Sequence, residues 1–229
     1  TLDKVLTLRP ERIALFGYAH VPWARSHQKL IREEDLADAS GRFEQSQAAA
    51  ERLVKAGYVA IGLDHFALPN DDLALGVATG TLRRNFQGYT TDQPPTLIGL
   101  GASSIGRMPG GYVQNMPAEV AWRDAILQGR LPVARGVKLT DDDRLRADVI
   151  ERLMCDFQVD LAAVATRHGV SPVVFSGDIA KLADLHDDGL VQVGGDVVRV
   201  TKAGRPFVRL AAQAFDHRSD TREGFSRAI

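Results

Sequence analysis

Two short apolar runs on either side of an amphipathic segment constrain the fold of this chain most strongly. The first run, residues 13–18, is almost continuously apolar, as in a strand that is buried on both faces. Residues 43–57 carry an apolar stripe at helical spacing, and Gly57 is placed to end that helix. The second run, residues 58–63, again has the character of a buried strand. Strand, helix and strand at this spacing predict a βαβ unit, which favours an α/β fold with a parallel sheet.

Polar residues follow each predicted strand at its end. A third apolar run, residues 96–100, leads into a glycine-rich turn, and a helix is expected over 118–127. In barrels and open sheets of the α/β class, the residues directly after the strands line the active site. We therefore expect residues 1–131 to form the last part of an α/β barrel or open sheet. The side chains expected to converge on its cavity are His20, Asp64, His65, Ser103 and Ser104.

The character of the sequence changes after Pro132. Thr140 followed by three aspartates is a good helix start, because the Thr caps the first turn and the acids favour the helix dipole. Alternating apolar residues on both sides of a Gly194-Gly195 turn predict a β-hairpin. Further helices are expected over 161–168, 175–187 and 203–214. Residues 132–229 are thus predicted to form a mainly helical, winged-helix-like domain.

Residues 84–91 have the composition of a pocket wall. They contain a guanidinium, two amides, a phenol and two hydroxyl groups around one Phe and one Gly. Such a mixture suits a wall that orients a large, partly apolar ligand. The alternative is a buried polar network that holds the barrel closed. The candidate residues in this stretch are Arg84, Asn85, Gln87 and Tyr89.

Three further residues have both a functional and a structural interpretation. Asp64 can fix the tautomer of His65, so that His65 donates a hydrogen bond to a substrate. The same pair can instead satisfy loop amides at the end of a strand. His20, beside another strand end, either contacts a ligand or has a structural role only.

These segments, read in order, resemble one known family. The resemblance extends over the segments 17–23, 62–69, 84–91, 99–106, 112–115, 146–150 and 225–229. Together they resemble the oxygen-independent coproporphyrinogen III oxidases, a radical S-adenosylmethionine family of haem biosynthesis. Family members bind a [4Fe-4S] cluster through a Cys-rich loop, whereas this chain has one cysteine, Cys155, interpreted as a buried structural thiol. The resemblance therefore implies the C-terminal part of a radical S-adenosylmethionine barrel, without its cluster ligands and with no metal site in this chain.

The family resemblance also implies a reaction and roles for individual residues. Family members oxidatively decarboxylate two propionates of coproporphyrinogen III to give protoporphyrinogen IX, by means of a 5′-deoxyadenosyl radical. Ala19 and Ile105 match family positions that contact S-adenosylmethionine. The expected substrate-binding residues are His20, Asp64, Asn85 and Gln87, and the candidate catalytic residues are His65, Arg84 and Tyr89. Arg84 can pair with a propionate or fix its own loop, and Arg25, Lys29 and Arg83 are alternative cations.

The resemblance further predicts that an N-terminal half is missing. The chain alone is then expected to be inactive and to self-associate through an unpaired strand edge. The alternatives are a related protein that binds or delivers haem, and a fragment without chemistry.

Composition excludes other partners. Residues 140–215 carry nine basic and twelve acidic side chains, the opposite of what phosphate binding requires, so no nucleic acid is expected. The sequence contains no apolar run of membrane-spanning length and no signal peptide. A single cysteine favours a reducing compartment, and so the cytoplasm.

Overall fold

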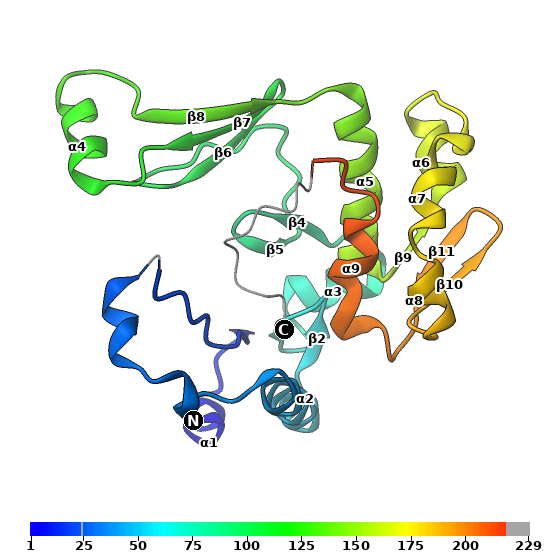
Figure 1. Cartoon of the computed structure of the whole chain (residues 1–229), viewed down its shortest axis with the longest axis horizontal. Coiled ribbons are helices and arrows are strands. Elements are labelled where there is room, and N and C mark those ends of the chain that lie inside the picture. The colour runs from blue at the N-terminus through cyan, green and yellow to red at the C-terminus, as the bar shows by residue number, and fades with distance from the viewer. Residues whose placement is uncertain (24, 219–229) are drawn as a thin grey trace.

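The computed structural model describes residues 1–23 and 25–218 and shows a mixed α/β fold. Within these residues the strands form four small sheets, in which every pairing is antiparallel. Figure 1 shows the N-terminal elements at the lower left, a β-sheet with one helix above them, and the C-terminal helices on the right. The segment 225–229 of the family resemblance lies outside the described residues.

The N-terminal part builds one three-stranded sheet against a long helix. Asp38 caps the long helix α2 by accepting a hydrogen bond from the Gly41 amide, and Gly57 follows the helix in a left-handed conformation (φ +93°), so the predicted helix is confirmed. The elements of this part are α1 (Leu2–Leu8), β1 (Arg12–Ala14), η1 (Ser26–Leu30), η2 (Glu33–Asp35), α2 (Ala39–Lys55), β2 (Val59–Ile61) and β3 (His65–Ala67).

The two strands of the predicted βαβ unit, β1 and β2, run parallel in one sheet but do not pair with each other, because β3 lies between them. The sheet order is β1-β3-β2, and β3 is antiparallel to both neighbours, since Ala67 stands opposite both Arg12 and Val59. The chain reverses after β2 through Gly62, whose positive φ (+54°) permits a tight turn. The strand that follows this turn then occupies the position between β1 and β2. Periodicity alone does not reveal this insertion, because it depends on a turn of three residues.

Two of the predicted buried strands are also shorter and more exposed than expected. The first run reaches only Ala14 as a strand, and Phe16 is 64% exposed. The third run contributes only a single antiparallel bridge, between Leu97 and Arg107, while Leu100 is 85% exposed. An apolar run is buried only where another layer of the protein covers it. Within the described residues, only one side of the first run is covered, where Ile13 and Leu15 pack against Leu53, Tyr58 and Phe66.

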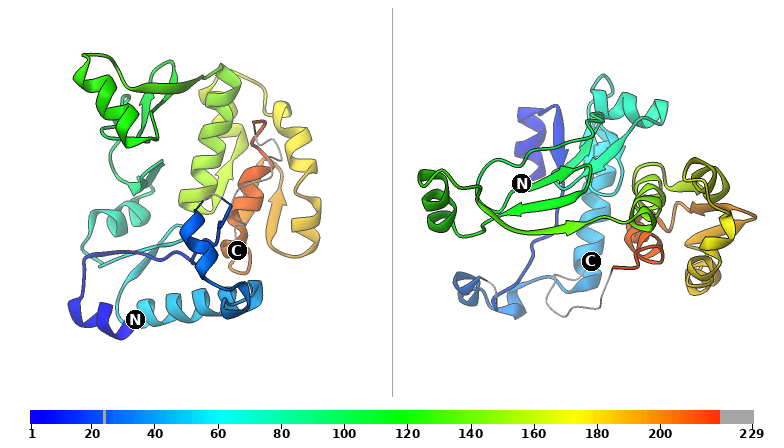
Figure 2. Two further views of the ribbon diagram at one scale, coloured as in Figure 1. Left: turned by 60° about the vertical axis from the view of Figure 1, so that its left-hand side comes forward. Right: turned by 90° about the horizontal axis from the view of Figure 1, so that it is seen from above.

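The middle of the chain forms a hairpin and a second three-stranded sheet that the sequence did not predict. Residues 84–91 lie in the hairpin β4–β5, and the sheet β6-β7-β8 with helix α4 extends away from the C-terminal helices (Figure 2). The expected helix over 118–127 is confirmed as α4. The elements are α3 (Asp72–Thr79), β4 (Arg83–Asn85), β5 (Gly88–Thr90), β6 (Ile105–Met108), β7 (Gly111–Asn115), α4 (Glu119–Leu127) and β8 (Val133–Lys138).

The C-terminal part follows the predicted order of helices and hairpin with three differences. Thr140 and Asp143 form a reciprocal capping box at the start of α5, as the sequence predicted. The hairpin turns at Gly195-Asp196, one residue later than expected, and a further strand, β9, pairs with β11. The last two predicted helices are each divided. The elements are α5 (Asp141–Asp156), β9 (Gln158–Asp160), α6 (Leu161–Arg167), η3 (Pro172–Phe175), α7 (Ser176–Ala180), α8 (Ala183–Asp187), β10 (Val191–Gly194), β11 (Val197–Val200), η4 (Arg205–Phe207) and α9 (Val208–Gln213).

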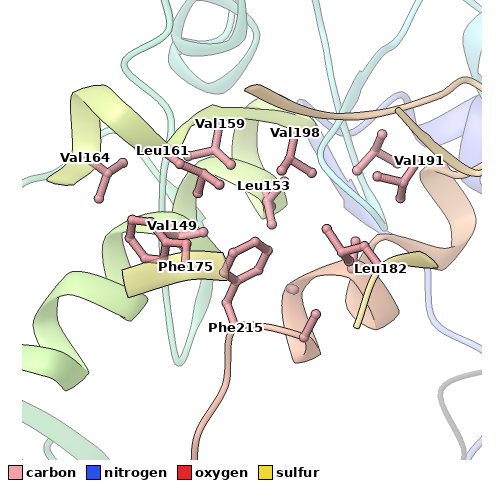
Figure 3. Packing of buried hydrophobic residues seen from close by; sticks show 14 of the residues in the cluster. Val149, Leu153, Val159, Leu161, Val164, Phe175, Leu182, Val191, Val198 and Phe215 are labelled. Carbon is pink, nitrogen blue, oxygen red and sulfur yellow. The ribbon is translucent and has the colours of Figure 1, made fainter. Parts of the chain in front are cut away.

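The main hydrophobic core belongs to this C-terminal part. Eighteen buried apolar residues between Leu145 and Phe215 form one cluster, and Figure 3 shows Phe175 and Phe215 at its centre. A second cluster joins the two parts, because it combines Ile61 of β2 with Cys155 of α5. Cys155 is buried as predicted, and burial raises the pKa of its thiol to about 12.

Candidate functional site

Asp64 and His65 form the centre of the candidate site, in the turn that joins β2 to β3. The Nδ1 atom of His65 lies 2.7 Å from Oδ1 of Asp64. Both side chains are largely buried, with exposed fractions of 17% for His65 and 13% for Asp64. Since no described residue hydrogen-bonds to Nε2 of His65, that nitrogen is open to a ligand. The predicted pairing of Asp64 with His65 is therefore present.

Tyr89 packs directly against this pair from strand β5. Its ring meets the His65 ring edge-on, with 5.2 Å between the ring centroids. The Tyr89 hydroxyl accepts a hydrogen bond from the Leu63 amide and donates one to the Met154 carbonyl, both at 3.0 Å. Burial raises the pKa of Tyr89 to about 12, so its hydroxyl stays protonated at neutral pH. Gly62 leaves the space for this ring, since a Cβ at position 62 would lie 2.1 Å from it.

Arg84, Asn85 and Gln87 lie on the hairpin that carries Tyr89. The Arg84 guanidinium lies over the Tyr89 ring, 5.7 Å from its centroid, and the Arg84 side chain is exposed. The Arg84 amide donates to Glu151 of α5. Asn85 accepts a hydrogen bond from the Gln87 amide at 2.8 Å, which stabilises the turn between β4 and β5. Among the described residues no carboxylate pairs with the Arg84 guanidinium, whereas Asn85 is engaged in its own turn.

Ala19 and His20 lie in the long connection after β1. The Ala19 carbonyl accepts a hydrogen bond from the Gln28 side chain. The Nδ1 atom of His20 is buried and has no hydrogen-bond partner among the described residues, and the ring lies beside Tyr18. A buried imidazole nitrogen without a partner carries a desolvation cost that a ligand would relieve.

Ile105 belongs to a different sheet. It begins β6, opposite Gln114 of β7. This sheet meets the hairpin β4–β5 where Phe86 packs edge-on against Tyr112, with ring centroids 5.1 Å apart. The structure thus brings Asp64, His65, Arg84 and Tyr89 into one group. Ala19, His20 and Ile105 make no direct contact with that group among the described interactions.

Two clefts of the described surface lie away from these residues. One, of about 390 Å³, is lined by residues of α5, β9, α6 and β11, including Arg152 and Arg199. The other, of about 530 Å³, lies between α1 and α2. Neither of these two clefts is lined by a predicted site residue.

The residues present do not fit an iron-sulfur cluster. A [4Fe-4S] cluster is held by cysteine thiolates, and the one cysteine of this chain is buried in the core. The described residues also contain no group of three His, Cys, Asp or Glu side chains that could hold a metal ion. Among these residues no helix is long and apolar enough to cross a membrane.

One contact at the candidate group could not be expected from the sequence. Arg209 of α9 lies 3.7 Å from Oδ2 of Asp64, although 145 positions separate the two residues in the sequence. The sequence around Arg209 is typical of an exposed helix, and it does not indicate that Arg209 reaches the candidate site. Gly62 and Leu63 were likewise missed as parts of the group, because their role depends on a backbone turn.

Known proteins of one kind are similar to this chain in sequence and in structure. Residues 139–207 match the HemN C-terminal domain. The whole chain is 47% identical to an oxygen-independent coproporphyrinogen III oxidase of Bradyrhizobium diazoefficiens, of which it covers 51%. It is 42% identical to the anaerobic coproporphyrinogen III oxidase 1 of Cereibacter sphaeroides, of which it covers 50%. A solved coproporphyrinogen III oxidase (HemN) from Escherichia coli, described as a radical SAM enzyme, superposes on 95% of this chain with a TM-score of 0.88 and 36% identity.

The α/β fold is thus that of a radical SAM enzyme, of which the chain covers a part. More closely, the chain is similar along its whole length to oxygen-independent coproporphyrinogen III oxidases, as the sequence resemblance indicated. It spans about half the length of the curated relatives it matches.

Proposed function

We propose that this chain provides part of the substrate pocket of an oxygen-independent coproporphyrinogen III oxidase, which oxidatively decarboxylates two propionates of coproporphyrinogen III to give protoporphyrinogen IX. The observation that carries the proposal is the match along the entire chain to enzymes of that name, at 47% and 42% identity. S-adenosylmethionine and a [4Fe-4S] cluster would supply the radical chemistry when bound. The cluster ligands would come from the half that this chain lacks.

The residues of this chain would bind and orient the substrate. Arg84 has an exposed guanidinium beside Tyr89 and suits a propionate carboxylate. His65 would present Nε2 to the substrate, while Asp64 holds the other ring nitrogen. We assign Tyr89 the positioning of His65 rather than a reactive role, because both hydrogen-bonding capacities of its hydroxyl are already used.

The roles of the remaining candidates rest on the family resemblance and on their surroundings. Ala19 and Ile105 are proposed to contact S-adenosylmethionine, and His20 to meet a ligand through its unpartnered nitrogen. Asn85 and Gln87 are proposed to line the pocket from the turn between β4 and β5. Together these residues would approach the substrate from three separate segments of the chain.

The missing half of the enzyme is the proposed partner of an exposed apolar surface on this chain. Large apolar side chains are exposed along the first part of the chain and near residue 100, where the chain would contact the rest of a barrel. These are Phe16, Trp23, Leu30, Ile98 and Leu100. Exposed apolar surface of this extent favours association with another surface. We propose the cytoplasm as the compartment.

The C-terminal part is proposed to cover the pocket as a winged-helix-like domain. Its described elements follow the order helix, strand, helix, two short helices and a β-hairpin. We retain 1–131 and 132–229 as the proposed domains, although β8 pairs with β7 across that division. The excess of acidic side chains in 140–215 supports a role in packing rather than in binding nucleic acid.

The function is tested by joining this chain to the remaining half of the Bradyrhizobium relative. After anaerobic reconstitution, the joined protein is expected to show a cluster chromophore and to convert coproporphyrinogen III, whereas the 229-residue chain alone shows neither. His65→Ala and Arg84→Ala should each lower turnover by at least tenfold while the chromophore is retained, as expected for groups that meet the substrate. Arg199→Ala, an exposed arginine on β11, is the matched control. A joined protein that carries the cluster, binds haem and leaves coproporphyrinogen III unchanged would contradict the proposal.

A further inference from the structure

The carboxylate of Asp64 has two partners from opposite ends of the chain. Its Oδ1 atom lies 2.7 Å from Nδ1 of His65, and its Oδ2 atom lies 3.7 Å from Nη2 of Arg209 on α9. We propose that Arg209 is a positioning residue, through which the C-terminal helices orient Asp64 and thereby His65. This inference rests on the proposed function for its consequence in catalysis, but the geometry of the three side chains stands without it.

Burial makes the orientation of Asp64 sensitive to Arg209. Only 13% of the Asp64 side chain is exposed, so water solvates its charge poorly and each fixed partner has a large effect. With Oδ2 facing the guanidinium, Oδ1 is directed to the Nδ1–H group of His65. A neutral His65 ring then carries its proton on Nδ1 and presents the Nε2 lone pair, and a protonated ring presents an Nε2–H donor.

A second contact between the two parts of the chain holds the same turn. The Tyr89 hydroxyl joins the Leu63 amide to the Met154 carbonyl of α5, and the Leu63 side chain packs against the main C-terminal core. The aromatic edges of Phe16 and Tyr89 flank the His65 ring. The turn is therefore held from α5 by hydrogen bonds that do not involve charge. Arg209 adds the charged contact, which acts on the carboxylate rather than on the backbone.

Among residues 1–23 and 25–218, three charged groups act on His65 or on its partner Asp64. Asp64 is the direct partner, Arg209 acts on the far oxygen of Asp64, and Arg84 stands across the Tyr89 ring. Since 45% of the Arg209 side chain is exposed, the ion pair itself stabilises the fold little. A loss of stability would therefore not distinguish a positioning role from a merely structural one. The tautomer of His65 does, because it reports directly on how Oδ1 is held.

The tautomer can be read from the nitrogen shifts of labelled histidine in the full 229-residue chain. The His65 signals are assigned with His65→Gln. We expect the unaltered chain to show a ring protonated on Nδ1, and Arg209→Gln and Arg209→Met to shift both nitrogen signals toward the average of the two tautomers. Arg209→Lys should restore most of the original shifts, and Arg199→Gln is the matched control. Unchanged His65 shifts in both Arg209→Gln and Arg209→Met, with the chain still folded, would overturn the proposal.

Turnover of the joined enzyme separates this inference from the proposed function. We expect Arg209→Gln to lower kcat roughly tenfold through misplacement of His65, with KM within twofold and recovery in Arg209→Lys. If the unaltered joined enzyme does not act on coproporphyrinogen III but Arg209→Gln still changes the His65 shifts, the proposed function is wrong and the positioning role stands. If turnover is normal in Arg209→Gln and the shifts do not move, Arg209 has no positioning role. Should Arg209→Gln not fold, Arg209→Met, which keeps the apolar stem, decides between these outcomes.

Discussion

The region up to residue 138 and the region from 139 to 218 differ in how much of their apolar surface is buried. The second region contains one cluster of eighteen buried apolar residues, and only four large apolar side chains in it are exposed: Val170, Val173, Val174 and Leu210. The first region has two small clusters and eighteen exposed large apolar residues. The difference indicates that the C-terminal region supplies its own core, whereas the first region leaves much of its apolar surface exposed.

The strongest test of this difference is to separate the two regions and ask whether each folds by itself. We expect the fragment 139–229 to unfold cooperatively on heating, because its core lies almost entirely within it. The fragment 1–138 should show no cooperative transition and should self-associate, because its apolar surface lacks a cover. Circular dichroism during heating, with light scattering, measures both. Cooperative unfolding of a monomeric 1–138 fragment would remove the distinction.

Within the C-terminal region, the largest effect of a single substitution is expected at the centre of the core. Phe175 is fully buried and meets Phe215 edge-on, with ring centroids 6.1 Å apart. Phe175→Ala should lower the free energy of unfolding by about 3–5 kcal/mol, through lost apolar burial and a residual cavity. Urea denaturation of the full chain gives the value. Val173→Ala, two positions earlier and 72% exposed, is the control and should change it by less than about 0.5 kcal/mol.

A buried ion-pair network in the C-terminal region should make the stability of that region depend on pH. Asp178 is buried against Arg146, and it also accepts hydrogen bonds from Lys181 and His217. Burial alone would raise the pKa of Asp178, but the hydrogen bonds from His217, Arg146 and Lys181 outweigh it and hold that pKa below its usual value. The stabilisation is therefore complete above the pKa of an unfolded Asp, about 4, and is lost as the pH falls through the lower folded value.

Replacing Asp178 should consequently matter at neutral pH and less in acid. Asp178→Asn is expected to lower the free energy of unfolding by about 3 kcal/mol at pH 7, because it leaves the buried Arg146 with only the half-exposed Asp142 as a charge partner. Urea denaturation between pH 7 and pH 3 should show the two proteins becoming more alike as the pH falls. Asp184→Asn, on the exposed face of α8, is the matched control. A difference that stays constant over this pH range would contradict the assigned charge.

The smallest effect on stability is expected on the exposed apolar surface of the first region. Leu30 and Leu100 are 88% and 85% exposed, so Leu30→Ser and Leu100→Ser should change the free energy of unfolding of the chain by less than about 0.5 kcal/mol. Both substitutions should nevertheless reduce self-association, measured by light scattering at several protein concentrations. Val173→Ser, at a residue that is also largely exposed (72%) but lies outside that surface, should leave association unchanged. Equal effects of all three would show that this surface has no special role.

Local signals predicted the C-terminal region well. The capping box of Thr140 and Asp143, the apolar stripe with Val149 and Leu153, and the hairpin after residue 190 depend on residues close in sequence. Such signals need no partner from elsewhere in the chain. The divisions of the helices predicted over 175–187 and 203–214 are exceptions; in the first, Leu182 lies between α7 and α8 and is buried in the core.

The candidate site was predicted only in part. Residues 84–91 and the Asp64-His65 pair stood out by their chemistry, and the structure places Tyr89 against His65. The contacts that hold them did not stand out. Arg209 reaches Asp64 across 145 positions, and Tyr89 reaches Met154 across 65. Interactions of this kind arise from packing between elements, for which no periodic pattern exists in the sequence.

The sequence by itself determined the similarity to oxygen-independent coproporphyrinogen III oxidases, the helices of the C-terminal region and the chemical types gathered around Asp64 and His65. The tertiary structure decided how the strands pair, since the Gly62 turn places β3 between β1 and β2, so that each of these parallel strands pairs with an antiparallel neighbour. It also decided which side chains reach the candidate site from α5 and α9. The physical reason is that composition and local spacing fix the preferences of each segment, whereas strand order and distant contacts follow from how segments exclude one another when they are packed together.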